Sequence, residues 1–458
     1  MNIALTLVAV GFLVFLAHLF AGIFSRKRIP DVLMLIIIGL FVGPVFKIVH
    51  VGSFGMVGPV FTTITLVTIL FEGGTSLRLD QLRNSIRGTS LLTNVSFFAT
   101  MVVIGLIGWY FYKLEPMVAF TLGAIVGGTS SAVVIPLVKQ LNMGKNSGTI
   151  LILESAFSDV LCIVFALALM DAIEVGHLKI GLMVGNVLAS FILATLIGLF
   201  GSVFWSMILN KVRTVQNSIF TTPAFVFIIF GISELLGYSG AIAALAFGIG
   251  LANMDVLASP VVQRYIGSGA STLNETERVL FSEVVFLLKT FFFVYIGISI
   301  HLDDLQPILI GLILSVVLFF LRIPVVKLSI SASENQPKDM YYMAAIFPKG
   351  LAAAVLATMP LQRGIAGGEF IMNVTFSMVL FTIVFTSIFI PLIDKVPAVS
   401  KFYAFAFRFS GWVNIIPILF GLRTNTKKSK VNPVDFAELV KPVTEEKPEE
   451  SHEIKKDE

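Results

Sequence analysis

Charged residues are scarce in this sequence. Of its 458 residues, 13% are Asp, Glu, Lys or Arg and 56% are hydrophobic, whereas soluble domains carry about 25% charged residues. This shortage excludes a soluble protein of this size, because too little polar sequence remains to cover its surface. The single cysteine, Cys162, excludes an intrachain disulfide. The basic residues are scattered among short segments, so the net charge of +4 does not indicate a nucleic-acid partner.

The sequence also lacks motifs for covalent chemistry and for nucleotide binding. It has no Walker motif and no GxGxxG fingerprint after a predicted strand. It shows no nucleophile–base pair and no cluster of metal ligands. We therefore expect no enzyme activity, no cofactor, no nucleotide partner and no nucleic-acid partner.

Long apolar blocks make up most of the chain. Each is long enough to cross about 30 Å of hydrocarbon as a helix, which takes roughly 20 residues, and lipid offers backbone polar groups no other partners. The sequence therefore predicts an all-α membrane protein with about thirteen transmembrane helices. Their approximate limits are 3–24, 32–49, 56–74, 89–112, 116–141, 147–172, 180–208, 218–237, 239–254, 281–300, 305–330, 339–362 and 368–393.

Most basic residues lie in alternate loops, beginning with Arg26-Lys27-Arg28 after the first block. Because basic loops remain in the cytoplasm, this asymmetry predicts a protein of the cell membrane with its N-terminus outside and its C-terminus in the cytoplasm. We expect the transmembrane domain to cover residues 1–398. An interfacial aromatic-basic segment at 399–423 and a disordered cytoplasmic tail at 424–458 would follow it.

Two predicted spans, the fifth and the twelfth, are interrupted near the middle of the membrane. The fifth contains Gly127-Gly128 and hydroxyl residues before Pro136, and the twelfth contains Pro348-Lys349-Gly350. Both interruptions could be ordinary kinks, since Gly and Pro are frequent in membrane helices. Their equivalent places, fifth of the first six spans and fifth of the last six, favour two inverted six-helix repeats whose broken helices cross at an ion site.

Near its middle, the sixth span carries two acids, Glu154 and Asp159. Carboxylates at this depth are costly and indicate function. The two residues are five apart, so on a helix they point about 140° away from each other. We therefore expect one acid to bind the transported ion and the other to pair with a buried base. The alternative is that both acids are structural.

Few bases lie plainly within the membrane, away from the ends of the predicted spans: Lys289, Arg322 and Lys349. A planar guanidinium suits a permanent buried pair better than an ammonium does. We therefore assign Arg322 to Glu154 as a structural ion pair. Lys349 stands at the break of the twelfth span, where its charge can offset the carbonyl ends of opposing half-helices.

Asp159 is then the predicted ion site. Burial disfavours its ionised form, so a proton and a cation compete for one carboxylate. The remaining ligands of a hard cation such as Na⁺ or K⁺ would be oxygens of nearby hydroxyl residues, namely Thr129, Ser130, Ser155 and Ser158. Because only one acid is free to titrate, we predict one proton per cation and no net movement of charge.

These motifs resemble the monovalent cation/proton antiporter family, which contains the sodium/proton exchangers and their potassium/proton relatives. The similarity runs from about residue 5 to 395. Its motifs are Phe71-Glu72-Gly73-Gly74, Thr129-Ser130, Glu154-Ser155-Ala156-Phe157-Ser158-Asp159, Arg322 and Pro348-Lys349-Gly350-Leu351. The resemblance implies a thirteen-helix inverted repeat in which a core domain with crossing broken helices moves against a dimerisation domain, and hence a homodimer in the bilayer. It also implies that Asp159 binds the ion and the proton.

Three residues depart from the family pattern. Many sodium exchangers have an acid where this chain has Ser130, relatives usually have Asn, Asp or Gln at Ser158, and many electroneutral members have Arg at Lys349. Because these positions bear on the cation, alternatives remain. We favour a Na⁺/H⁺ antiporter. A K⁺/H⁺ antiporter of the same fold is the alternative, and a sodium-coupled symporter or channel on a similar scaffold is the second alternative.

Overall fold

A computed structural model describes residues 3–25, 30–49, 57–77, 79–175, 180–214, 218–257, 273–331 and 335–407. Within these ranges the regular elements are all helices and no strand occurs, so the predicted all-α class is confirmed. Residues 408–458 lie outside the described residues. They include most of the predicted interfacial segment and all of the predicted tail, and the proposed domain limits remain predictions.

Helices cover every predicted span. The first half of the chain forms α1 (Ile3–Ser25), α2 (Asp31–Leu40) with the π-helical turn η1 (Phe41–Val45), α3 (Val57–Ser76), α4 (Leu79–Tyr110), α5 (Pro116–Ile125), α6 (Ser131–Gln140) and α7 (Lys145–Val175). The second half forms α8 (Ile180–Val212), η3 (Ser218–Phe220), α9 (Thr221–Leu235), α10 (Gly240–Ala252), α11 (Met254–Leu257), α13 (Glu275–Ser299), α14 (Leu305–Ser329), α15 (Pro337–Ala345), α16 (Leu351–Gln362), α17 (Gly368–Lys395) and α18 (Pro397–Phe407).

Six of the described helices are long and apolar enough to cross a membrane, namely α4, α7, α8, α13, α14 and α17. Shorter apolar helices occupy the other predicted spans. The protein is therefore a multi-pass membrane protein. The total of thirteen crossings, the two inverted repeats and the orientation of the termini remain predictions.

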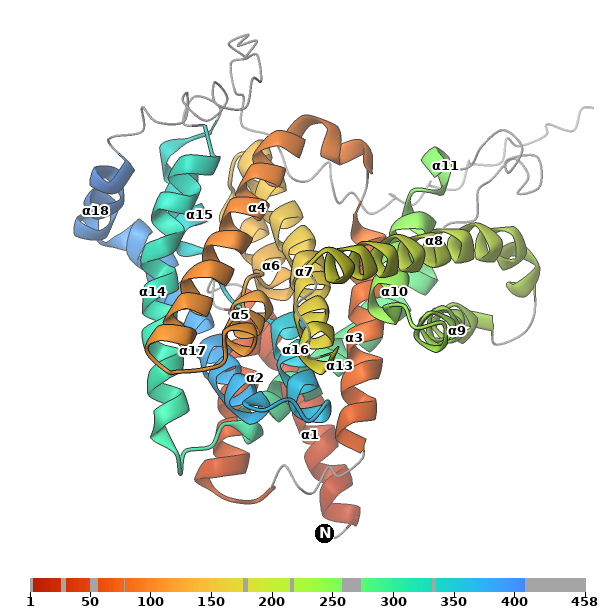
Figure 1. The fold of residues 1–458 in the computed structure, drawn as a ribbon, viewed down its shortest axis with the longest axis horizontal. Helices are drawn as coiled ribbons and strands as arrows, with labels where there is room; N and C mark the ends of the chain where they lie inside the picture. The colour runs from red at the N-terminus through yellow and green to blue at the C-terminus, as the bar shows by residue number, and fades with distance from the viewer. Residues whose placement is uncertain are drawn as a thin grey trace, which may run out of the picture.

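The helices pack as two units. The core unit contains α4–α7 and α14–α17, and the panel unit contains α1–α3, α8–α10 and α13; helices contact mainly others of their own unit. In Figure 1 the core unit occupies the left and centre, and α8 and α9 project to the right. Contacts between the units are fewer, and they include those of α7 with α8 and α10.

Glycine pairs bring helices of the panel unit into close contact. A Cβ atom at Gly248 of α10 would lie 2.3 Å from the carbonyl oxygen of Phe71 in α3, and one at Gly74 would lie 2.4 Å from that of Leu245. Both distances are far below ordinary van der Waals contact. The backbones of α3 and α10 can therefore touch only because neither residue has a side chain.

We expect Gly248→Ala to destabilise the panel unit. The new methyl group must push α3 and α10 apart, and overpacking of this kind costs about 1–3 kcal/mol. Gly231→Ala in α9 is the matched control, because a Cβ atom there meets nothing within 4 Å. Thermal unfolding in detergent measures both variants. A melting temperature of Gly248→Ala equal to that of Gly231→Ala would show that the contact is not close-packed.

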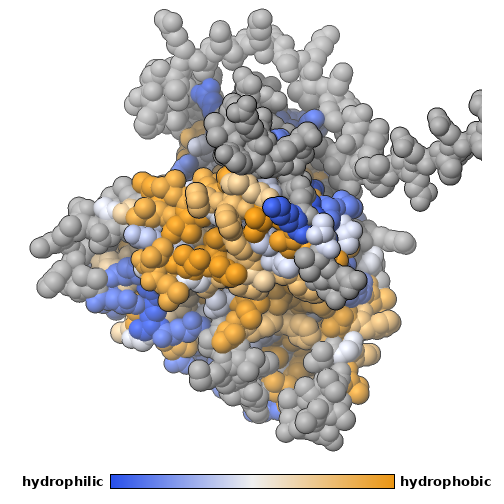
Figure 2. Space-filling model, turned by 90° about the vertical axis from the view of Figure 1, so that its right-hand side faces the viewer, coloured by the Kyte–Doolittle hydropathy of each residue, from blue (hydrophilic) through white to orange (hydrophobic). Residues whose placement is uncertain are grey.

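The side of the molecule from which α8 and α9 project is broadly apolar. Figure 2 shows hydrophobic residues spread over that face, with hydrophilic residues toward its edges. Exposed side chains of α8 include Ile192, Leu196 and Phe200, the last with 76% of its surface accessible. Such a continuous apolar surface is suited to lipid or to another protein surface and not to water.

Two predicted spans are broken into half-helices. The span predicted at 116–141 consists of α5 and α6, separated by residues 126–130, and the span predicted at 339–362 consists of α15 and α16, separated by residues 346–350. Both gaps contain residues that weaken a helix: Gly127 and Gly128 in one, and Pro348 and Gly350 in the other. These irregular segments are buried within protein, which is where non-helical backbone is tolerated at membrane depth.

Candidate functional site

The two breaks cross in direct contact. The backbone N–H of Ser130 donates to the carbonyl oxygen of Pro348 at 2.8 Å, and the Lys349 ammonium donates to the carbonyl oxygen of Gly128 at 2.8 Å. A Cβ atom at Gly350 would lie 2.1 Å from Ser130 Oγ, so only glycine permits this approach. The backbone N–H of Lys349 donates to Thr382 Oγ1 of α17 at 2.9 Å, which holds the break between α15 and α16 in place.

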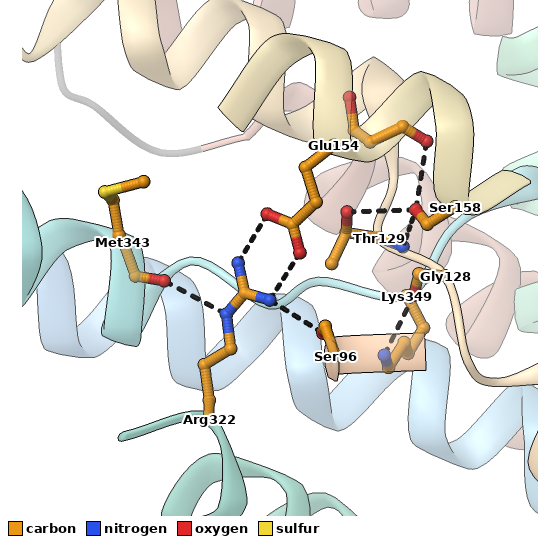
Figure 3. Close-up of polar contacts among 9 residues, drawn as sticks. Ser96, Gly128, Thr129, Glu154, Ser158, Arg322, Met343 and Lys349 are labelled. Atoms are coloured by element: carbon orange, nitrogen blue, oxygen red, sulfur yellow. Dashed lines mark hydrogen bonds and ion pairs between the residues drawn. The ribbon is translucent and has the colours of Figure 1, made fainter. Parts of the chain in front are cut away.

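Lys349 is almost completely buried, with 2% of its surface accessible. Its ammonium lies at the carbonyl group of Gly128, which the break between α5 and α6 leaves without a helical partner. The charge is therefore located between the half-helices. Figure 3 shows Lys349 reaching Gly128 across the crossing.

Glu154 of α7 and Arg322 of α14 form a buried two-pronged ion pair (Figure 3). The guanidinium Nη1 and Nη2 atoms donate to the two carboxylate oxygens of Glu154 at 2.5 and 2.6 Å. Arg322 also donates to Ser96 Oγ at 2.8 Å and to the Met343 carbonyl oxygen at 3.1 Å. Because these partners lie on α4 and α15, one side chain joins four helices of the core unit. Both charges are thereby neutralised.

Asp159 lies on another face of α7 and remains partly exposed. A Cβ atom at Gly128 would lie 3.4 Å from Asp159 Oδ1, which places the carboxylate beside the first break. Ser131, the first residue of α6, points its hydroxyl at Asp159 Oδ2 across 3.4 Å. The N-terminus of α6 therefore also lies near the carboxylate, where a helix dipole favours negative charge.

Sequence reasoning missed Ser131 as a site residue. It belongs to the hydroxyl run Thr129-Ser130-Ser131, but the sequence does not reveal which of these side chains faces α7. In the structure, α6 begins at Ser131, and the hydroxyls of Ser130 and Ser131 point to different surroundings. Ser130 Oγ is buried at the crossing and has no hydrogen-bond partner among the described residues, whereas Ser131 faces Asp159.

The other predicted ligands form a network beside Asp159. Ser158 Oγ accepts from the Thr129 N–H at 3.1 Å and donates to the Ser155 carbonyl oxygen at 3.1 Å, and the hydroxyls of Thr129 and Ser158 lie 3.4 Å apart. Ser155 Oγ donates to the Ile152 carbonyl oxygen at 2.8 Å. The hydroxyls of Thr129 and Ser158 thus join the break between α5 and α6 to α7. Their oxygens can still accept a cation through remaining lone pairs.

This arrangement can bind a single positive charge. Among the described residues, no three His, Cys, Asp or Glu side chains are grouped as a metal cluster would require. One carboxylate surrounded by hydroxyl and carbonyl oxygens is the ligand type that hard cations prefer. A proton on the same carboxylate would remove the charge that attracts the cation.

Comparison with known proteins relates the chain to transporters. Residues 11–395 match the family described as "Sodium/hydrogen exchanger, transmembrane". The Na⁺/H⁺ antiporter 1 of Methanocaldococcus jannaschii is 26% identical over 377 residues, covering 77% of this chain and 83% of the relative. The K⁺/H⁺ antiporter NhaP2 of Shewanella sp. strain MR-4 is 24% identical over 377 residues, covering 79% of this chain but only 62% of that longer protein.

The fold has a solved counterpart. The structure of the sodium proton antiporter MjNhaP1 from Methanocaldococcus jannaschii at pH 8 matches with a TM-score of 0.67 and 21% identity. The match covers 90% of this chain and all of that one. At this level of identity the likeness concerns the fold alone.

Proposed function

The chain belongs to the sodium/hydrogen exchanger family, a family of transporters, and from this membership we propose that it exchanges a monovalent cation for a proton at Asp159. Na⁺ is the favoured cation and K⁺ the alternative. The observation that carries the proposal is the position of Asp159 beside the crossing half-helices, partly exposed, while Glu154, the other acid near the middle of α7, is neutralised by Arg322.

Exchange follows from competition for one carboxylate. Ionised Asp159 attracts a cation, with Ser131 and the Thr129–Ser158 network supplying neutral oxygens. When the cation leaves, a proton can neutralise Asp159 for the return. The boundary between the two units would allow the core unit to move against the panel unit and so open the site to each side in turn. Movement is unfavourable when Asp159 is ionised and empty, because an uncompensated charge would be buried.

The K⁺ alternative has a specific basis. Several relatives are named K⁺/H⁺ antiporters, and this site has Ser130, a neutral residue, at the crossing. With a single acid and neutral oxygens around it, the cation preference depends on the size of the site in its occupied form.

We expect the purified protein in proteoliposomes to move protons when Na⁺ is added, with Li⁺, K⁺ and Rb⁺ compared in the same dye-dequenching assay. One proton per cation predicts that an imposed membrane potential leaves the initial rate unchanged. Protein-free vesicles are the control. If none of the four cations dissipated the proton gradient, antiport would be refuted. If the initial rate followed the imposed membrane potential, only electroneutrality would be refuted.

Ser131→Ala should weaken cation binding without abolishing exchange. The variant removes one oxygen from the site and one hydrogen bond to the ionised form of Asp159. A bond of this kind contributes about 1 kcal/mol, so the apparent KM should rise about five-fold. The rise should be largest at low pH, where the proton competes most strongly. Ser131→Thr, which keeps the hydroxyl, is the matched control, and equal KM values for the two variants would remove Ser131 from the site.

We also propose a homodimer whose interface includes the apolar face of α8. Exposed residues Ile192, Leu196 and Phe200 support it, and lipid covering the same face in a monomer is the alternative. Light scattering in detergent should give a protein mass of two chains. A mass of one chain at every protein concentration would contradict the dimer.

A further inference from the structure

A cavity of about 340 Å³ lies between the two units. Residues of α7 and α16 form its wall on the core side, and residues of α3, α8, α9 and α10 form its wall on the panel side. Its lining combines apolar side chains with three charged residues, Asp171, Glu234 and Arg363. None of these three residues belongs to the site around Asp159.

The cavity points along α7 toward the proposed ion site. Asp159, Ile163, Leu167 and Asp171 are spaced four residues apart and share one helix face. The last three line the cavity, and Ile163 is one helical turn, about 6 Å, from Asp159. Ile163 is fully buried. In this conformation the cavity therefore ends at an apolar residue one turn short of Asp159.

Charges of both signs lie at the end of the cavity away from Asp159. Arg363, the residue that follows α16, places Nη1 2.6 Å from Asp171 Oδ1 and 3.4 Å from Glu174 Oε1. All three belong to the core unit. Arg363 thus partly neutralises two acids in the last turns of α7.

Glu234 faces them from the panel unit. One of its oxygens accepts from the Gly240 N–H at 2.7 Å, so the carboxylate is held at the start of α10. Within the part of the chain that the structure describes, Glu234 has no ion-pair partner. The cavity and its mouth therefore hold three acids, Asp171, Glu174 and Glu234, against one base.

We propose that this cavity is an electrostatic vestibule that concentrates the transported cation, with Glu234 as the positioning residue that attracts it and Arg363 as the residue that limits the attraction. The inference rests on the proposed exchange at Asp159. Apolar walls focus the field of a few charges and raise the local concentration of an oppositely charged substrate. Glu234 acts before the cation reaches the site, so it changes how readily Asp159 is loaded and not how the ion is held there.

The proposal predicts opposite effects for charges of opposite sign. Glu234→Gln should raise the apparent cation KM about two- to four-fold. This is the effect expected of one charge about 10 Å from the path of the cation, in a medium whose dielectric constant lies between those of protein and water. Its amide oxygen can still accept from Gly240, so the fold is retained. Arg363→Gln should lower KM by a similar factor, and the double variant should return close to wild type. The maximal rate should stay unchanged in all three.

The measurement uses full-length protein in membrane vesicles of one orientation, with the cation added to one face at a time. The shifts should appear only on the face to which the cavity opens. They should shrink when choline chloride is raised from about 10 mM to about 150 mM, because the screening length falls from about 30 Å to about 8 Å. Asp303→Asn is the matched control, since Asp303 is an exposed acid outside the cavity lining.

Several outcomes would overturn the vestibule. Shifts of Glu234→Gln and Arg363→Gln in the same direction would indicate a structural effect, and so would shifts that added salt does not reduce. An equal shift in Asp303→Asn would indicate a general surface charge. The proposed function is tested independently of the vestibule. It requires that the wild-type protein exchanges cations for protons and that the Asp159→Asn variant does not, whatever result the Glu234 variant gives.

Discussion

Asp159→Asn should abolish cation-driven proton movement and leave the protein folded. Asparagine has nearly the same shape, but it carries no charge for a cation and does not exchange a proton near neutral pH. The rate in proteoliposomes should fall to that of protein-free vesicles. Asp303→Asn, which removes an exposed acid elsewhere, should keep the wild-type rate.

A second readout separates loss of binding from loss of movement. A ligand that binds only the folded state stabilises it by RT ln(1 + [L]/Kd). The melting temperature of wild-type protein should therefore rise with the transported cation, and that of Asp159→Asn should not. Exchange that persists in the variant, or a melting temperature that still responds to the cation, would place the ion at another residue.

Breaking the Glu154–Arg322 pair should have the largest effect on stability. Glu154→Gln leaves the Arg322 guanidinium buried without a countercharge, and loss of one partner of a buried pair costs about 3–5 kcal/mol. The melting temperature in detergent should fall strongly, as should the yield of folded protein. Lys338→Gln is the control, because Lys338 pairs with Asp394 at the surface with 59% of its side chain exposed, and such pairs contribute about 0–1 kcal/mol.

The double variant Glu154→Gln with Arg322→Met tests whether the loss of stability comes from the buried guanidinium that lacks a countercharge. Removal of both charges leaves no uncompensated ion, so the double variant should be more stable than Glu154→Gln alone. The fold should also retain some exchange activity, since Asp159 is untouched. If Glu154→Gln instead changed cation selectivity and kept the wild-type melting temperature, the division of roles between Glu154 and Asp159 would be wrong.

Several features of the site were predictable because they depend on one helix at a time. The five-residue separation of Glu154 and Asp159 fixes their angle on any helix, so different surroundings for the two acids could be inferred without coordinates. Glycine and proline near midspan likewise predicted where the helices α5–α6 and α15–α16 would be interrupted. The comparisons confirm the family, while the roles of the individual residues remain proposals.

Ser131 and the vestibule were not predictable in this way. Whether Ser130 or Ser131 faces Asp159 depends on where α6 begins and on how its first turn is rotated against α7, and neither follows from helical periodicity. Glu234 and Arg363 belong to different units and are far apart in sequence. Only the packing of α9, α10 and α16 brings them to one cavity.

The sequence by itself determined that this is a helical membrane protein, that two helices are broken, and that Glu154 and Asp159 on α7 have different surroundings. These properties follow from hydrophobicity, backbone chemistry and the geometry of a single helix. The tertiary structure decided that Gly350 and Ser130 touch, that Ser131 faces Asp159, and that a charged cavity leads toward it. Such contacts depend on the relative placement of separate helices, which no local pattern encodes.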